Sequence, residues 1–133
     1  MGKKEFNFWQ DHSINFLEMA LNKDRSEKVK NPDARGKKHG DCGDSIEYFL
    51  MIKEDKIDKI SFDVEGCMNS FACANTVAHF LEGKTIGKAW ELTPDKVIDF
   101  LETLPEHETH CAELALGSFY LALNDYQKKT KEK

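Results

Sequence analysis

Three of the four cysteines stand where secondary-structure elements are expected to begin or end. Cys42 lies in a glycine-rich stretch before a strand, Cys67 lies where a strand passes into a helix, and Cys111 lies near the start of the last helix. A helix N-terminus offers free N–H groups and a partial positive charge, which favour the thiolate that binds metals or attacks sulfur. We therefore expect thiolate chemistry at these positions, with a lowered pKa for Cys111.

The spacing of these cysteines does not by itself define their role. They lie far apart in the chain, without the C-x2-C pairs of a structural zinc site or the cysteine runs of a ferredoxin. Unrelated buried cysteines are an alternative, because cysteine is often buried without a function. A thiol redox enzyme is disfavoured because no C-x-x-C pair is present to close a catalytic disulfide.

The composition is that of one globular domain, expected to span residues 1–133, with 40% hydrophobic residues and a net charge of −5. The N-terminus has no apolar signal core and no apolar run is long enough for a membrane span, so a cytoplasmic protein is expected. Four cysteines in such a chain favour metal binding or thiol chemistry over disulfides. The basic stretch 23–38 has no aromatic residue, which argues against nucleic-acid binding and leaves a solvated loop or a surface for an acidic partner.

The pattern of apolar residues and turn signals predicts an α+β fold. Apolar residues at helical spacing indicate an N-terminal helix over 5–21, and a long loop follows over 22–45. Alternating strands are expected at 46–53 and 57–64, joined as an antiparallel hairpin. The helices expected after the hairpin span 69–82, 85–91, 94–103 and a last segment that begins near 106–111 and ends near 127.

The cysteine motifs resemble the signature of the IscU/NifU iron–sulfur cluster assembly scaffolds. That family has C-G-D before a strand, G-C at a strand–helix junction and H-C opening the final helix, and this chain has Cys42–Asp44, Gly66–Cys67 and His110–Cys111 in that order. Shorter matches are Asn31-Pro32, the LEGKT segment at 81–85, Leu104-Pro105 and Asp125-Tyr126. The resemblance covers about residues 31–127, and it implies an N-terminal helix and a small antiparallel sheet packed against C-terminal helices.

The resemblance also implies a function: a scaffold, not an enzyme, on which a [2Fe–2S] cluster is assembled from iron and sulfur and then transferred to recipient apo iron–sulfur proteins. Sulfur is expected as persulfide from a cysteine desulfurase, with Cys111 as its acceptor. By motif position, Cys42, Cys67 and Cys111 are the implied cluster ligands, Asp44 is the carboxylate beside the first cysteine, and His110 is the candidate fourth ligand. Family members also hold zinc here, so Cys42, Asp44, Cys67 and Cys111 are the expected metal ligands.

Two features leave alternatives open. The same thiolates would suit a zinc-binding, persulfide-accepting sulfur-transfer accessory that never builds a cluster. The family's L-P-P-V-K-x-H-C segment reads LPEHETHC at 104–111. Since this segment is the one that a dedicated Hsp70-type chaperone reads in the family, that chaperone is not an expected partner here.

The remaining candidate residues have ordinary interpretations beside functional ones. Cys73 falls on a predicted helix, where a packed thiol is the expectation and a spare sulfur acceptor the alternative. His39 and His107 flank the motifs as loop histidines that could ligate a metal occasionally, whereas His12 and His79 are expected on helices as surface or packing residues. Asp41 is interpreted as a solvated turn residue, since the motif favours Asp44 as the carboxylate.

Overall fold

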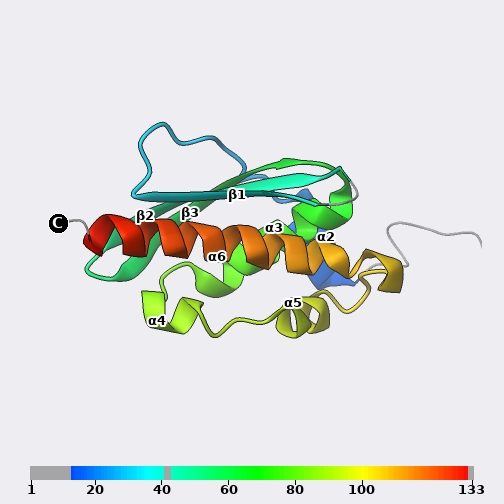
Figure 1. Ribbon diagram of the computed structural model, residues 1–133. Helices are drawn as coiled ribbons and strands as arrows, with labels where there is room; N and C mark the ends of the chain where they lie inside the picture. The colour runs from blue at the N-terminus through cyan, green and yellow to red at the C-terminus, as the bar shows by residue number, and fades with distance from the viewer. Residues whose placement is uncertain (1–12, 41–42, 132–133) are drawn as a thin grey trace, which may run out of the picture.

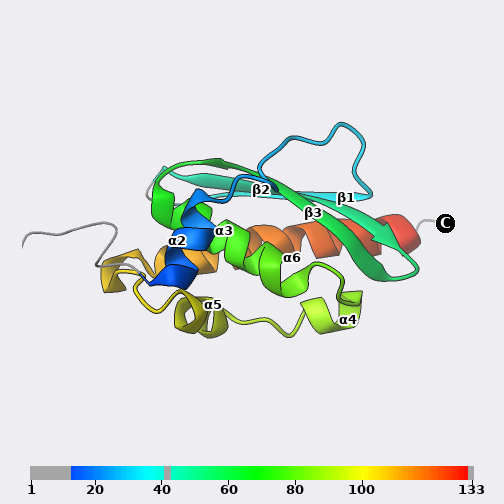
Figure 2. The ribbon, with the colours of Figure 1, turned by 180° about the vertical axis from the view of Figure 1, so that it is seen from behind.

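The structure is a computed structural model that describes residues 13–40 and 43–131. A three-stranded sheet forms one layer, and helices α3 (Met68–Leu81) and α6 (His110–Lys131) cover one of its faces (Figures 1 and 2). The helices α4 (Ile86–Ala89) and α5 (Pro94–Leu101) lie on the side of α3 and α6 that is away from the sheet. This arrangement confirms the α+β class.

The sheet is antiparallel and has the order β1-β2-β3, from β1 (Ala34–His39), β2 (Ser45–Lys53) and β3 (Lys56–Glu65). The predicted hairpin is β2 and β3, which a two-residue turn at Glu54 and Asp55 connects. Both turn residues have positive φ, as the tight hairpin turns that match the strand twist require. The expected inward faces are confirmed, since Ile46, Tyr48 and Leu50 of β2 and Ile60 and Phe62 of β3 are all buried.

Strand β1 corrects the prediction of a long loop over residues 22–45. Its segment, ARGKKH, lacks the apolar alternation that marks a strand, because the inward positions are the small residues Ala34 and Gly36. Small residues are needed there because α6 lies directly on β1. A Cβ atom at Gly36 would come within 2.3 Å of the backbone nitrogen of Ala122.

The helices follow their predicted positions with shifted ends. The single helix predicted over 5–21 is corrected, because helix α2 (Ile14–Leu21) begins after Ser13, whose backbone is extended and whose hydroxyl caps the helix by accepting the N–H of Phe16. The predicted positions 5–12 lie outside the described residues. Thr85 caps α4 and Pro94 opens α5 as predicted, whereas α5 ends at Leu101 instead of 103. A short 3-10 turn, η1 (Glu106–Glu108), precedes α6, which continues to Lys131, beyond the predicted end near 127.

The core lies between the sheet and helices α3 and α6. Its aromatic centre is Tyr48 of β2, whose ring meets Phe119 of α6 edge-on at 5.1 Å and Phe62 of β3 at 6.1 Å. The buried Tyr48 hydroxyl donates a hydrogen bond to the carbonyl oxygen of Ala74 in α3 at 2.7 Å. The centre therefore joins both layers, and it holds the start of α6 in a fixed relation to the ends of the strands.

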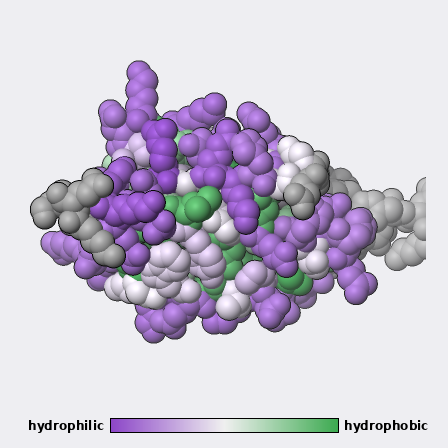
Figure 3. Space-filling view, viewed as in Figure 1, coloured by the Kyte–Doolittle hydropathy of each residue, from purple (hydrophilic) through white to green (hydrophobic). Residues whose placement is uncertain are grey.

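The surface seen in Figure 3 is mainly polar and charged, with small apolar patches over α6. In the described part of the chain, no helix combines the length and apolarity needed to cross a membrane.

Candidate functional site

The site lies at the end of the sheet where β2 begins and β3 ends. Ser45, the first residue of β2, pairs with Glu65, the last residue of β3. Asp44 and Gly66 are the neighbours of that pair, so the hairpin register places them side by side, and Cys67 follows at once as the N-cap residue of α3. Two residues distant in sequence, Asp44 and Cys67, are therefore adjacent because of backbone pairing alone.

Gly66 makes room for the Asp44 side chain. A Cβ atom at position 66 would come within 2.4 Å of Asp44 Cγ and 2.7 Å of its Oδ2. Such distances are far below van der Waals contact, so the carboxylate occupies the space that a side chain at position 66 would fill. The G-C dipeptide thus contributes both the thiol and the gap through which a carboxylate reaches it.

The Asp44 carboxylate is held at the N-terminus of α3. Its Oδ2 accepts the Ser70 hydroxyl at 2.6 Å, and the backbone N–H and thiol of Cys67 at 3.4 Å each. The Ser70 hydrogen bond, together with those from Cys67, lowers the pKa of Asp44, so this side chain is a carboxylate that can bind a cation. Ser70 was not predicted from the sequence, although its place one turn after Cys67 on the predicted helix was the available signal.

Cys111 completes the first group of donors. The Sγ atoms of Cys67 and Cys111 and a carboxylate oxygen of Asp44 all lie within 4.8 Å of one another. Ser70 Oγ lies between them, 3.4 Å from Cys111 Sγ and 3.8 Å from Cys67 Sγ. Three elements therefore converge on one point: the start of β2, the start of α3 and the start of α6.

The expectation of a lowered pKa for Cys111 is wrong. Burial raises the pKa of this thiol to about 12, and the neighbouring Cys67 and Glu108 add to the increase, although a hydrogen bond from Ser70 opposes it. Cys111 is fully buried, whereas Cys67 is exposed. The helix N-terminus favours a thiolate, but here the loss of solvation has the larger effect.

Glu108 belongs to a second group of donors that the sequence did not predict. Its carboxylate oxygen, the Nε2 atom of His110 and Cys111 Sγ all lie within 4.8 Å of one another. The Cys111 thiol donates a hydrogen bond to Glu108 Oε2 at 3.4 Å. The signal was present as an i, i+3 relation between Glu108 and Cys111 at the start of the predicted last helix.

The other residues singled out in the sequence lie outside the described residues or away from the two donor groups. Asp41, Cys42 and His12 lie outside the described residues. Cys73 is fully buried, and burial raises its pKa well above the ordinary value, which confirms a packed thiol. His79 is exposed and its ring contacts Phe100 at 5.2 Å, as expected for a surface residue that packs on its neighbours.

His39 and His107 are exposed and belong to neither group of possible metal ligands among the described residues. His39 ends β1 and is not a loop residue. His107 Nε2 lies 3.7 Å from Glu108 Oε1, next to the second group but outside it.

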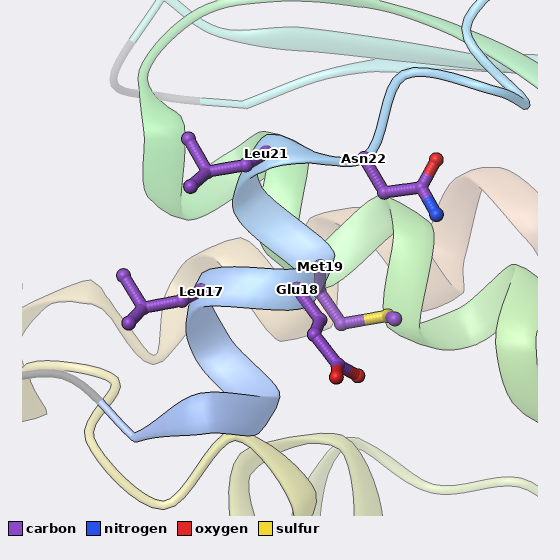
Figure 4. A pocket seen from close by; sticks show the side chains of 5 residues that line it. All are labelled: Leu17, Glu18, Met19, Leu21 and Asn22. Carbon is purple, nitrogen blue, oxygen red and sulfur yellow. The ribbon is translucent and has the colours of Figure 1, made fainter.

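A surface depression of about 530 Å³ along α2 is a weaker candidate for a chemical site than the donor groups around Cys111. Leu17, Glu18, Met19, Leu21 and Asn22 line it. Figure 4 shows Leu17 and Leu21 projecting to one side of the helix and Glu18 to another. Glu18 is the one titratable side chain of this lining, so the depression has no set of converging donors like that around Cys111.

The fold and the donor groups are those of a small thiolate-bearing α+β domain, and a family comparison agrees. Residues 22–133 match the NifU-like N terminal domain, and the chain belongs to this family.

Curated relatives point to the same family. The chain is 33% identical over 88 residues to iron–sulfur cluster assembly scaffold protein IscU 1 of Archaeoglobus fulgidus, covering 66% of this chain and 58% of that protein. It is 30% identical over 106 residues to iron–sulfur cluster assembly protein IscU of Plasmodium falciparum, covering 80% of this chain and 64% of that protein. The match thus spans a little over half the length of the Archaeoglobus relative.

Solved structures share the fold. A NifU-like protein (N-terminal) from Brucella abortus superposes with a TM-score of 0.72 at 16% identity, over 88% of this chain and 94% of its own. A protein from Fervidobacterium islandicum, described as an iron–sulfur cluster assembly scaffold for the SUF system, superposes with a TM-score of 0.71 at 20% identity, over 88% of this chain and 99% of its own. At these identities the likeness concerns the fold alone.

Proposed function

We propose that this chain is a scaffold on which a [2Fe–2S] cluster is assembled and from which it is transferred to recipient apo iron–sulfur proteins. The observation that carries the proposal is the convergence of Asp44, Cys67 and Cys111 donor atoms within 4.8 Å at one end of the sheet. Cys42 is added to this set by its motif position, two residues before Asp44 in the chain. The relatives named as IscU scaffolds support the same role.

The mixed donor set suits a cluster that must be released to another protein. Stable clusters are normally held by four thiolates. Here the proposed set is three thiolates with Asp44 or His110 as the fourth ligand, and a hard carboxylate is a poor match for a sulfur-rich cluster. The exposed Cys67 gives the cluster one edge open to solvent and to a recipient, while the buried Cys111 anchors the other.

Sulfur is proposed to arrive from a cysteine desulfurase as persulfide, with Cys111 as acceptor. The support for Cys111 is the family motif, because its buried, protonated state makes it a weak nucleophile in the free protein. Transfer then requires the bound desulfurase to open this end of the domain. In this role the chain is a carrier and not a catalyst of turnover.

Anaerobic reconstitution with iron and sulfide tests the proposal. We expect a brown protein with visible charge-transfer bands, and loss of those bands in each of Cys42→Ser, Cys67→Ser and Cys111→Ser. Cys73→Ala is the matched control, since it removes a buried thiol outside the donor groups, and it should assemble the cluster. A protein that stays colourless and binds only zinc under all conditions would support the zinc-binding sulfur-transfer accessory instead.

A further inference from the structure

Glu108, His110 and Cys111 form a compact triangle of metal-binding atoms next to the proposed cluster site. Glu108 Oε2 lies 3.4 Å from Cys111 Sγ and 3.7 Å from His110 Nε2, and His110 Nε2 lies 3.8 Å from Cys111 Sγ. All three distances are measured between the same three atoms, so they are the sides of one triangle. The triangle thus has its geometry before any ion is bound.

These distances are close to those of a coordination tetrahedron. Bonds of about 2.3 Å to sulfur and about 2.0–2.2 Å to imidazole nitrogen and carboxylate oxygen, at tetrahedral angles, place the ligand atoms about 3.3–3.7 Å apart. The observed triangle is within a few tenths of an ångström of that range. A small rotation of the His110 ring is enough to close it around an ion.

The surroundings of the triangle favour loading from solvent. Half-buried Glu108 and the more exposed His110 lie between the buried Cys111 thiol and solvent. His107 Nε2 lies 3.7 Å from the second carboxylate oxygen of Glu108, where it can orient that side chain as an outer-shell partner. The fourth vertex is left for water, as in metal sites that exchange their ligands.

We propose that Glu108, His110 and Cys111 form a second metal position, for a divalent first-row transition ion, beside the Asp44–Cys67–Cys111 position. The inference rests on the proposed function in that the metal is cargo for the cluster and that His110 and Cys111 are also proposed cluster ligands, whereas Glu108 belongs to the second position alone. Oxygen, nitrogen and sulfur donors together suit Fe²⁺ or Zn²⁺ and discriminate against Mg²⁺ and Ca²⁺. Because Cys111 belongs to both positions, an ion can exchange its other ligands one at a time while it stays bound to this sulfur.

The test weakens the first position by removing its thiols other than Cys111, and Glu108→Gln then reports on the second position alone. The double variant Cys42→Ser/Cys67→Ser is titrated anaerobically with Co²⁺, whose sulfur-to-metal charge-transfer and visible bands report thiolate binding in a tetrahedral site. We expect one Co²⁺ per chain. Adding Glu108→Gln should weaken binding at least tenfold, and adding Cys111→Ser should abolish the charge-transfer band.

Glu106→Gln is the matched control, because Glu106 is an exposed carboxylate of the same η1 turn and lies in neither donor group. It should leave the Co²⁺ affinity within twofold. Thermal melting of each variant without metal verifies that it is folded. A folded double variant that binds no Co²⁺, or one whose affinity is the same with Glu108→Gln, overturns the inference.

The two proposals fail in different experiments. If wild-type protein builds no cluster on reconstitution, the scaffold function fails whatever the Co²⁺ titration gives. If the cluster forms but Glu108→Gln does not change Co²⁺ binding in the double variant, only the second position fails.

Discussion

A methyl group at Gly66 is expected to displace the Asp44 carboxylate without replacing any proposed ligand. In Gly66→Ala the new Cβ would lie 2.4 Å from Asp44 Cγ and 2.8 Å from its Cβ. Ordinary van der Waals contact begins about 1 Å further out. Because the clash includes the Asp44 Cβ atom and not only the end of a flexible chain, the whole side chain must move by about that amount.

A displacement of about 1 Å has two calculable consequences. Metal–ligand distances vary by only about 0.2 Å, so a shift of about 1 Å removes Asp44 as a ligand for a bound metal ion. The hydrogen bond from Ser70, 2.6 Å long, is also lost. A hydrogen bond to a charged group contributes about 1.5–3 kcal/mol, and partial exposure of Asp44 reduces the expected loss to about 1–2 kcal/mol, or roughly 3–8 °C in Tm.

The assay is a double-mutant cycle with Zn²⁺ or Co²⁺ affinity as the readout. Gly66→Ala and Asp44→Ala should each weaken binding to a similar extent, and the two together should weaken it no further than either alone. Gly87→Ala is the control glycine, since a Cβ there meets no atom within 4 Å. It should leave metal binding unchanged.

Additive effects of Gly66→Ala and Asp44→Ala on affinity would refute the reasoning. Additivity would mean that the methyl group acts on the backbone of the strand–helix junction and not through the carboxylate. Wild-type affinity in a folded Gly66→Ala protein would refute it equally, since Asp44 would then be able to leave the gap at no cost.

Four further outcomes are expected. Iodoacetamide at pH 8 should label the exposed Cys67 before the buried Cys111, because the Cys111 thiol, with its pKa of about 12, is protonated at that pH. Cys111 should gain reactivity only as the pH rises toward that value. Mass spectrometry gives the order of labelling, and equal labelling of the two cysteines would contradict the prediction. In the presence of a cysteine desulfurase and cysteine, persulfide should nevertheless be found on Cys111, and persulfide confined to Cys67 would exclude it as the acceptor. Asp44→Ala should make the bound cluster longer-lived and its transfer slower, because alanine removes a hard carboxylate and its repulsion of sulfide. The variant also loses the hydrogen bond from Ser70, so the decay is measured well below its lowered Tm, where faster bleaching than in the wild type would count against a release role. An Hsp70-type chaperone of the scaffold family should bind weakly or not at all, since acidic side chains stand at 106 and 108 in place of Pro-Val-Lys, and calorimetry showing ordinary micromolar binding would contradict this.

The hairpin and most helix starts could be predicted because their signals are local. Thr85 and Pro94 mark helix starts by side-chain and ring geometry, and alternating apolar residues mark the inward faces of β2 and β3. Strand β1 could not be predicted in this way. Its inward residues, Ala34 and Gly36, are small because a helix backbone lies against them, and that contact is visible only in three dimensions.

The sequence could indicate candidate donor residues but not the environment in which they lie. The motif spacing indicated Asp44, Cys67 and Cys111, whose donors converge in the structure. The state of Cys111 was predicted wrongly because its burial depends on how α6 meets the sheet. Ser70 and Glu108 each stand one helical turn from a motif cysteine, which is a local signal, but whether their side chains meet the other donors depends on packing between elements.

The pairing of Ser45 with Glu65 makes the donor geometry depend on a distant part of the chain. The two-residue turn at Glu54 and Asp55, together with the register shift between Met51 and Ile52, sets which residue of β3 opposes each residue of β2, and β2 is nine residues long. At about 3.3 Å per residue, that turn lies about 30 Å from the thiols. One residue inserted there, if the strands slipped to accommodate it, would carry the strand–helix junction about 3.3 Å past Asp44 and turn alternate side chains to the opposite face. A length change in this remote turn would therefore displace the donor atoms unless a second bulge absorbed it, as the one between Met51 and Ile52 absorbs Asp58.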